Sequence, residues 1–244
     1  MAININLVRN SVLFILNKSN LGYLGVSEFN TFCTLAQQDI FENLFFQYNQ
    51  FINRQNKRLT GSEYADLPKN LREQIDVFAE YTTQANFTYN SGTNLWSYSG
   101  SDLYRAENLS LVQISNNKKI DIEEVSKRRL NVMNNSDLTK PSLIFPVYEK
   151  ISNSFRIYPI APSTHFVEMF YLRSPKAPKW TFTMVQGNPI YNASATDLQH
   201  IELHPSLLIP FLTKVLAYAG LSIREPEVEQ YANSEEMKKI NTQV

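Results

Sequence analysis

Three residues in this chain, His200, Glu202 and His204, are of the types that bind zinc and supply a general base. In a zinc-protease helix the histidines stand four apart and the glutamate directly follows the first of them. Here the histidines have that spacing, but Glu202 lies two residues after His200 and Pro205 follows at once. The zinc-deaminase pattern also fails, because no paired cysteines follow. We expect capping and packing roles for these residues, and no metal.

Other reactive side chains lack the neighbours that catalysis requires. Cys33 is the only cysteine, and it lies in an apolar helical stripe, where a thiol behaves as a small hydrophobe. The chain contains no Gly-x-Ser-x-Gly elbow and no glycine-rich phosphate loop. Glu123 and Glu124 are adjacent, so on a helix they would not face each other as a glycosidase pair does. We expect that the protein is not an enzyme and binds no cofactor. A hydrolase whose active site combines residues distant in sequence remains an open alternative.

The charges of the chain balance, with 23 Lys plus Arg against 23 Asp plus Glu. No net field therefore draws the protein to nucleic acid or to an anionic membrane. The early apolar run from Val12 to Leu16 is too short to span a bilayer, and we see no secretory signal. A basic group, Lys118, Lys119 and residues 127–129, could touch phosphates weakly, although solvated surface or inter-subunit ion pairs are its commoner roles. The lone cysteine fits assembly in a reducing cytoplasm.

Aromatic residues in two segments are candidates for a partner interface. Segment 91–102 sets Trp96 and Tyr98 among small polar residues. It is either a loop that exposes aromatic rings or a β-hairpin whose rings cover the edge of the core. A last, polar helix opened by Pro226 would anchor on a neighbouring chain through two apolar side chains. The candidate interface residues are Trp96, Tyr98, Arg128, Arg129, Arg224, Tyr231 and Met237.

The elements that would hold these residues begin with helices at both ends of the chain. Apolar residues recur at spacings of three and four over 5–17 and 27–56, and Ser27 is placed to cap the second helix. A further helix is predicted after Pro68, which suits a first helical turn. Pro205 likewise predicts the start of an apolar helix near the C-terminus.

Between residues 86 and 193 the pattern changes to short β-branched and aromatic runs broken by Gly, Pro, Asn and Ser, which predicts antiparallel sheet. Runs 146–152 and 155–160 would pair as a hairpin. Residues 165–173 are apolar on both faces, as in a central strand covered on both sides. A helix from Asp121, as its cap, to about Met133 would interrupt the sheet.

Together these elements predict an α+β fold in which N- and C-terminal helices pack as a bundle around an inserted antiparallel β-region. The predicted domains are an N-terminal helical part (1–85), the β-region with one helix (86–196) and C-terminal helices that pack on the N-terminal part (197–244).

The order of elements and several short phrases resemble the head-to-tail connector proteins of tailed bacteriophages, the adaptor or gatekeeper rings, and especially the ring proteins of crAss-like phages. The phrases are the turn from Tyr23 to Phe29, Tyr158 to Pro162, Tyr171 to Pro175 followed by Pro178 and Trp180, Ile201 to Pro205, and Arg224 to Pro226. None of them is a site motif.

This resemblance implies a structural subunit of the virion, assembled in the host cytoplasm as a cyclic ring of about twelve copies. It implies the portal protein and the next tail component as partners, with residues from Pro226 onward on the portal, and genome DNA passing through the lumen. The balanced charge suits DNA that must slide past. The alternative is a carbohydrate- or receptor-binding virion module that uses Trp96, Tyr98 and Trp180 as stacking platforms.

Overall fold

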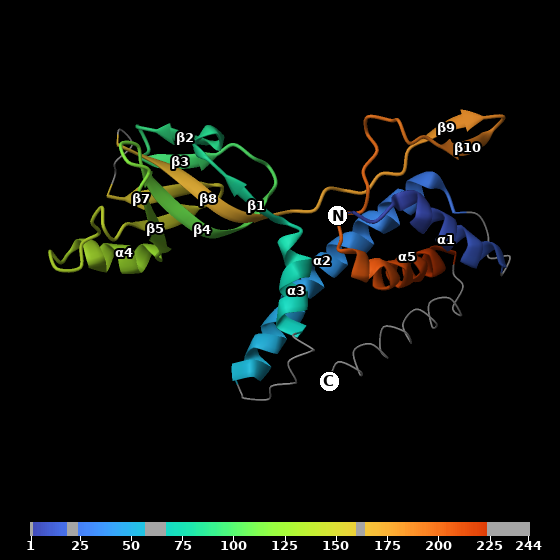
Figure 1. Ribbon diagram of the computed structural model, residues 1–244, viewed down its shortest axis with the longest axis horizontal. Coiled ribbons are helices and arrows are strands. Elements are labelled where there is room, and N and C mark those ends of the chain that lie inside the picture. Colours follow the sequence, from blue (N-terminus) through green and yellow to red (C-terminus); the bar gives the residue numbers. More distant parts are fainter. Residues whose placement is uncertain (1, 19–23, 57–66, 160–163, 224–244) are drawn as a thin grey trace. The chain divides into compact units, whose positions relative to one another are not determined.

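The computed structural model describes residues 2–18, 24–56, 67–159 and 164–223 (Figure 1). Residue contacts group the chain into two units, and each is described by itself. The first unit combines Met1–Val77 with Pro175–Val244, and the second is Phe78–Ser174. These two units are groups of residues in contact, and they do not test whether parts of the chain fold independently. The predicted division into three domains therefore stays a prediction.

Helices α1 (Ile5–Lys18), α2 (Val26–Asn56), α3 (Leu67–Asp76) and α5 (Leu208–Ile223) belong to the first unit. Each buries side chains three or four residues apart, which is the period that places them on one helix face. α2 packs against α3 and α5, and α5 also packs against α1. The buried positions include Ile5, Val8, Val12 and Leu16 in α1, Phe29, Cys33, Ala36 and Ile40 in α2, Leu71 and Ile75 in α3, and Phe211, Val215 and Ala219 in α5.

The start of α2 differs from the prediction. Ser27 was expected to be the cap, but the helix already begins at Val26. The carboxylate of Glu28 instead accepts a hydrogen bond, at 2.9 Å, from the backbone N–H of Gly25, the residue before the helix. A glutamate at the third helical position that reaches back to the cap residue is half of a capping box.

Pro205 opens a short 3-10 turn, η2 (Pro205–Leu207), that leads into α5. His204 caps this turn, because its side chain accepts a hydrogen bond from the N–H of Ser206. The helix start predicted at Pro205 is confirmed.

The second unit is built on an eight-stranded sheet with the order β1-β8-β4-β5-β6-β7-β3-β2. All neighbouring strands are antiparallel except β5 and β6, which run parallel. The strands are β1 (Ala79–Thr82), β2 (Phe87–Asn90), β3 (Leu95–Tyr98), β4 (Leu103–Gln113), β5 (Lys119–Glu124), β6 (Val147–Ile151), β7 (Ser154–Tyr158) and β8 (His165–Arg173).

This sheet is curled, because its two outermost strands are consecutive in the chain. Only residues 83–86, which include the short 3-10 turn η1 (Gln84–Asn86), join β1 to β2. The Asn86 amide donates to the Thr82 hydroxyl at 2.6 Å and ties the two strand ends together. The concave face is filled by buried side chains of Phe87, Trp96, Tyr98, Leu109, Leu111, Ile122, Tyr148, Phe155, Ile157, Val167, Met169 and Tyr171.

Residues 119–124 form a strand where the sequence predicted the first turn of a helix. They alternate polar and apolar side chains, and Ile122 is buried on the concave face, so the period of two prevails over the capping signal at Asp121. Helix α4 (Lys127–Asn134) begins later and is capped by Ser126, whose side chain accepts from the N–H of Arg129.

Two predictions for the strands fare differently. The hairpin of β6 and β7 is confirmed, and Ser152 in its turn has a positive φ of 55°. β8 was expected to be central and covered on both sides. It lies between β1 and β4, one strand from the sheet edge. Its outer face is covered only in part, because Glu168 and Leu172 are 8% and 4% exposed whereas Phe170 is 42% exposed.

The predicted fold class is wrong, although helices and strands do occur together as predicted. Among the described residues the main sheet is curled and mixed, and the five helices do not form a terminal bundle around an antiparallel insert. Local periodicity identifies helices but does not specify their packing partners. Nor does it distinguish a parallel pair of strands from an antiparallel one, since the two differ in connection and hydrogen bonding.

Candidate interaction site

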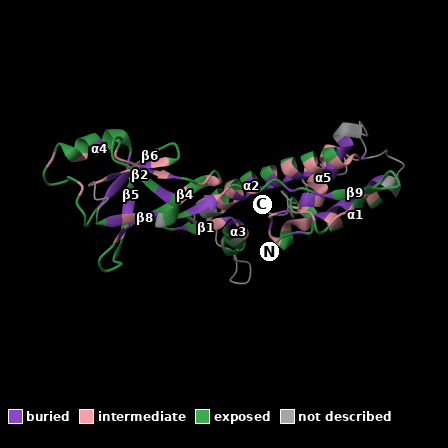
Figure 2. Ribbon diagram, turned by 90° about the horizontal axis from the view of Figure 1, so that it is seen from above, coloured by how far each residue is buried: buried purple, intermediate pink, exposed green. Residues whose placement is uncertain are grey.

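The residues predicted for a partner interface lie in three different settings. Trp96 and Tyr98 are each only 7% exposed and pack in the core of the sheet, so this segment is the hairpin that covers the core. Arg128 and Arg129 are exposed on α4, which Figure 2 shows as almost entirely green. Arg224, Tyr231 and Met237 lie outside the described residues.

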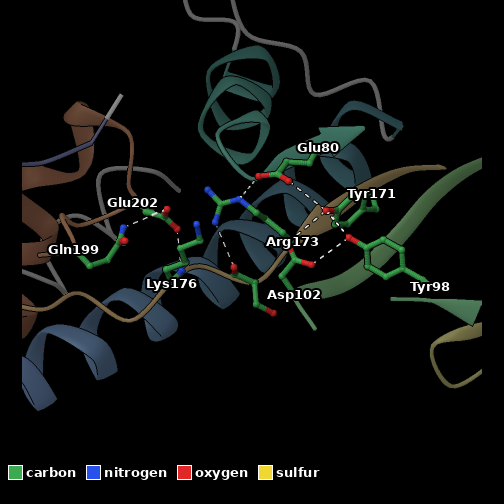
Figure 3. A network of polar contacts seen from close by, with 9 residues as sticks. Glu80, Tyr98, Asp102, Tyr171, Arg173, Lys176, Gln199 and Glu202 are labelled. Carbon is green, nitrogen blue, oxygen red and sulfur yellow. Dashed lines mark hydrogen bonds and ion pairs between the residues drawn. The ribbon is translucent and has the colours of Figure 1, made fainter. Parts of the chain in front are cut away.

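The two histidines and Glu202 have the capping and packing contacts that their sequence context suggested. His200 accepts from the backbone N–H of Ile5 at 3.5 Å, and His204 caps η2. The Glu202 carboxylate accepts from the backbone N–H of Lys176 at 2.8 Å, as Figure 3 shows. Across the described residues, no group of three or more His, Cys, Asp or Glu side chains is arranged to hold a metal ion.

A polar network at one end of the curled sheet joins three strands (Figure 3). The Tyr98 hydroxyl donates to the Tyr171 hydroxyl at 2.8 Å, and the Tyr171 hydroxyl lies 3.2 Å from a carboxylate oxygen of Glu80. The Asp102 carboxylate oxygens lie 3.2 and 3.4 Å from the Tyr98 and Tyr171 hydroxyls, so Asp102 is an alternative acceptor for the single proton of either phenol. Arg173 lies 2.6 Å from Glu80.

Burial raises the pKa of both Tyr98 and Tyr171. The phenols therefore stay protonated at neutral pH, where they donate to carboxylates instead of acting as bases. The network holds β1, β3 and β8 in place, and we assign it a structural role.

Cys33 is fully buried in α2, and burial raises the pKa of its thiol. A protonated thiol inside the core is not a nucleophile, which agrees with its position in the apolar stripe.

A hairpin formed by β9 (Phe182–Val185) and β10 (Asn188–Tyr191) exposes apolar side chains in the first unit (Figure 1), and we call it the arm. Gln186 and Gly187 join its strands with φ of 50° and 82°, as a tight hairpin turn requires. No charged residue occurs from 180 to 196. The exposed apolar side chains of the arm are Phe182 at 42%, Met184 at 63%, Val185 at 47% and Ile190 at 50%.

Trp180 fixes the base of the arm. Its indole is 2% exposed and stacks with Phe182 and with Tyr191, with ring centroids 5.9 Å apart in each pair. Its N–H donates to the Asn6 side chain at 3.0 Å, and its backbone N–H donates to Asn30 at 2.9 Å. An isolated two-stranded hairpin is marginally stable in water, so these contacts are what hold the arm in a defined conformation.

The second unit exposes apolar side chains in residues 127–145, comprising α4 and the segment after it, which we call the tip. The tip is internally bonded: the backbone N–H of Lys140 donates to Ser136 at 3.0 Å, and that of Phe145 donates to Ser142 at 3.1 Å. Leu130 anchors α4 in a buried cluster with Val125 and Val147. The exposed apolar side chains are Val132 at 66%, Leu138 at 96%, Leu143 at 43%, Ile144 at 70% and Phe145 at 77%.

Sequence reasoning missed both the arm and most of the tip. Gln186-Gly187 between two runs that contain apolar residues is a recognisable hairpin signal. The run Leu143-Ile144-Phe145 was equally visible, but a short apolar run usually marks a core strand. Exposed apolar groups of this kind mark interaction surfaces, so the arm of the first unit and the tip of the second unit are two separate candidate surfaces among the described residues.

No model of a known protein family matches this sequence, and no similar curated protein was found. Among the described helices, none is both long enough and apolar enough to cross a bilayer.

Proposed function

We propose that this chain is a non-catalytic ring subunit of a bacteriophage head-to-tail connector, positioned in the virion between the portal and the next tail component. The observation that carries the proposal is the arm, an uncharged and apolar projection held in one conformation by a buried tryptophan. Such a preorganised surface suits a permanent protein contact, because little conformational entropy is lost on binding.

A second observation supports repeated copies of the chain. The arm and the tip are unlike surfaces, one without charge and one basic, and every copy has both. Contacts between unlike surfaces are head-to-tail, and they generate closed rings when the rotation between copies closes. The resemblance to connector rings supplies the copy number of about twelve, the portal as partner and the passage of genome DNA.

The alternative of a glycan-binding module loses its stacking platforms. Trp96 and Trp180 are 7% and 2% exposed, so neither ring offers a face on which a sugar could stack.

The proposal is tested by mixing the purified full-length protein with the portal of the virus that encodes it and imaging the product by electron microscopy. We expect closed rings stacked on the portal and, in intact particles, density for the curled sheet and α2 at the head-to-tail junction. A protein that stays monomeric with the portal at micromolar concentrations, and that is missing from purified particles, would overturn the proposal.

A further inference from the structure

We propose that the tip docks the acidic C-terminal segment of a second copy of this chain, residues 225–237, in place of the portal contact that the family resemblance implies for residues from Pro226 onward. This inference rests on the proposed ring function, and it names the partner that the tip contacts when copies assemble.

Charge is the first argument. The tip contains four basic residues, Lys127, Arg128, Arg129 and Lys140, and one acidic residue, Asp137, for a net charge of +3. Segment 225–237 contains five glutamates and no basic residue, for a net charge of −5. In a chain whose charges balance overall, these two stretches are opposite in sign. Complementary charge steers association and fixes which surfaces meet.

The basic side chains of the tip are available for such a contact. Lys127, Arg128 and Lys140 are exposed. Arg129 lies 3.4 Å from Glu123, but both side chains are more than 60% exposed. An ion pair this open to water contributes little to stability, so exchanging Glu123 for a glutamate of another copy costs little.

Apolar side chains are matched as well. The tip exposes Val132, Leu138, Ile144 and Phe145, and the segment 225–237 has apolar residues, Val228, Tyr231 and Met237, between its glutamates. A surface that is both basic and apolar favours a partner that is both acidic and apolar. Contact with such a partner removes apolar area from water and places each basic side chain near an acidic one.

The chain length allows this contact between copies. Met237, the last residue of the docking segment, lies fourteen residues after Ile223, the last residue of α5. A stretch of that length spans up to about 50 Å when fully extended, which is enough to reach a neighbouring molecule. Each copy supplies one tip and one acidic segment, and this unlike pairing propagates around a ring.

The test uses the full-length protein with two introduced cysteines, Lys140→Cys in the tip and Glu229→Cys in the segment, and a short bis-maleimide reagent. Cys33 is buried and stays unreactive. We expect cross-linked multimers on a denaturing gel. When isotopically labelled and unlabelled copies are mixed, we expect mass spectrometry to find cross-linked peptides that combine the two labels. Lys118→Cys in place of Lys140→Cys is the matched control, because Lys118 is an exposed lysine outside the tip.

Charge reversal makes the test specific. Arg128→Glu with Lys127→Glu should lower the cross-linking yield about tenfold, and copies that carry Glu227→Lys with Glu235→Lys should restore it when mixed in. The inference would be overturned if cross-links formed only within one copy, or if Lys118→Cys gave the same yield as Lys140→Cys. It would also be overturned if charge reversal left the yield unchanged, or if the segment bound only the portal. Rings that form without the tip cross-link would refute only the inference, whereas cross-linked copies that never enter a particle would refute only the connector function.

Discussion

The guanidinium of Arg9 lies over the indole of Trp180, 3.9 Å from the ring centroid. Arg9 is the one charged residue between Met1 and Asn17, and it is 8% exposed. A cation over a desolvated tryptophan face is attracted by the ring quadrupole. This contact joins α1 to the base of the arm, so Trp180 should contribute strongly to the stability of the first unit.

Trp180→Ala should lower the free energy of unfolding by about 3 to 5 kcal/mol, because it opens a cavity where a large ring was fully packed. Urea denaturation followed by circular dichroism measures the change. Trp180→Phe keeps most of the apolar contact and should cost less than half as much. An alanine variant as stable as the wild type would show that the arm is held by other contacts.

Met184→Asp should weaken assembly without changing the stability of the isolated subunit, because its side chain is 63% exposed on the arm and a buried carboxylate without a partner is costly. Sedimentation velocity with and without portal measures assembly, and thermal unfolding checks the fold. Gln186→Asp adds the same charge at the polar turn and should assemble normally. Loss of assembly in both variants would point to charge alone and not to the apolar face.

Tyr171→Phe should destabilise the protein by about 1 to 3 kcal/mol, because buried polar groups around the lost hydroxyl are left without their donor. Tyr89→Phe removes a hydroxyl that donates to Asn94 in a hairpin turn, and it should cost less. Equilibrium denaturation compares the two. Equal costs would mean that the network at the end of the sheet is not cooperative.

Glu168 predicts a pH dependence. Burial raises the pKa of its carboxyl, but hydrogen bonds from Lys119 and Tyr81 outweigh burial and hold the pKa below its ordinary value of 4.5. A carboxyl whose pKa is lower in the folded state stabilises the protein above the unfolded pKa, and this stability is lost as the pH falls through the folded pKa.

Wild-type protein should therefore exceed Glu168→Gln in stability at pH 6 to 7, and the difference should shrink as the pH falls below 4.5. Lys119 is largely exposed, so salt should reduce part of the difference. Urea midpoints across the pH range measure it. A difference that stays constant down to pH 3 would contradict the assignment.

Gly187→Ala should cost about 1 kcal/mol, because its φ of 82° is strained for any residue with a Cβ. No heavy atom lies within 4 Å of the Cβ that would be added, so the cost is purely conformational. Gly92→Ala lacks a positive φ and serves as the control. Thermal unfolding measures the melting temperature of both variants, and Gly187→Ala should show the larger decrease. Equal decreases would contradict the conformational explanation.

The sequence by itself determined the local elements. Periods of three and four located α1, α2 and α5, and alternation with turn residues located the hairpin of β6 and β7. These signals are local, since they depend on residues within one or two turns of each other. They failed at residues 119–124, where a short polar and apolar alternation competed with a capping residue.

Only the tertiary structure decided what each element packs against. Trp96 looked like a partner contact in the sequence and is buried, whereas Phe145 in an ordinary apolar run is 77% exposed. The curl that joins β1 to β2 brings residues more than seventy positions apart, such as Tyr98 and Tyr171, into one network. Burial depends on contacts between residues far apart in the chain, and no local pattern encodes them.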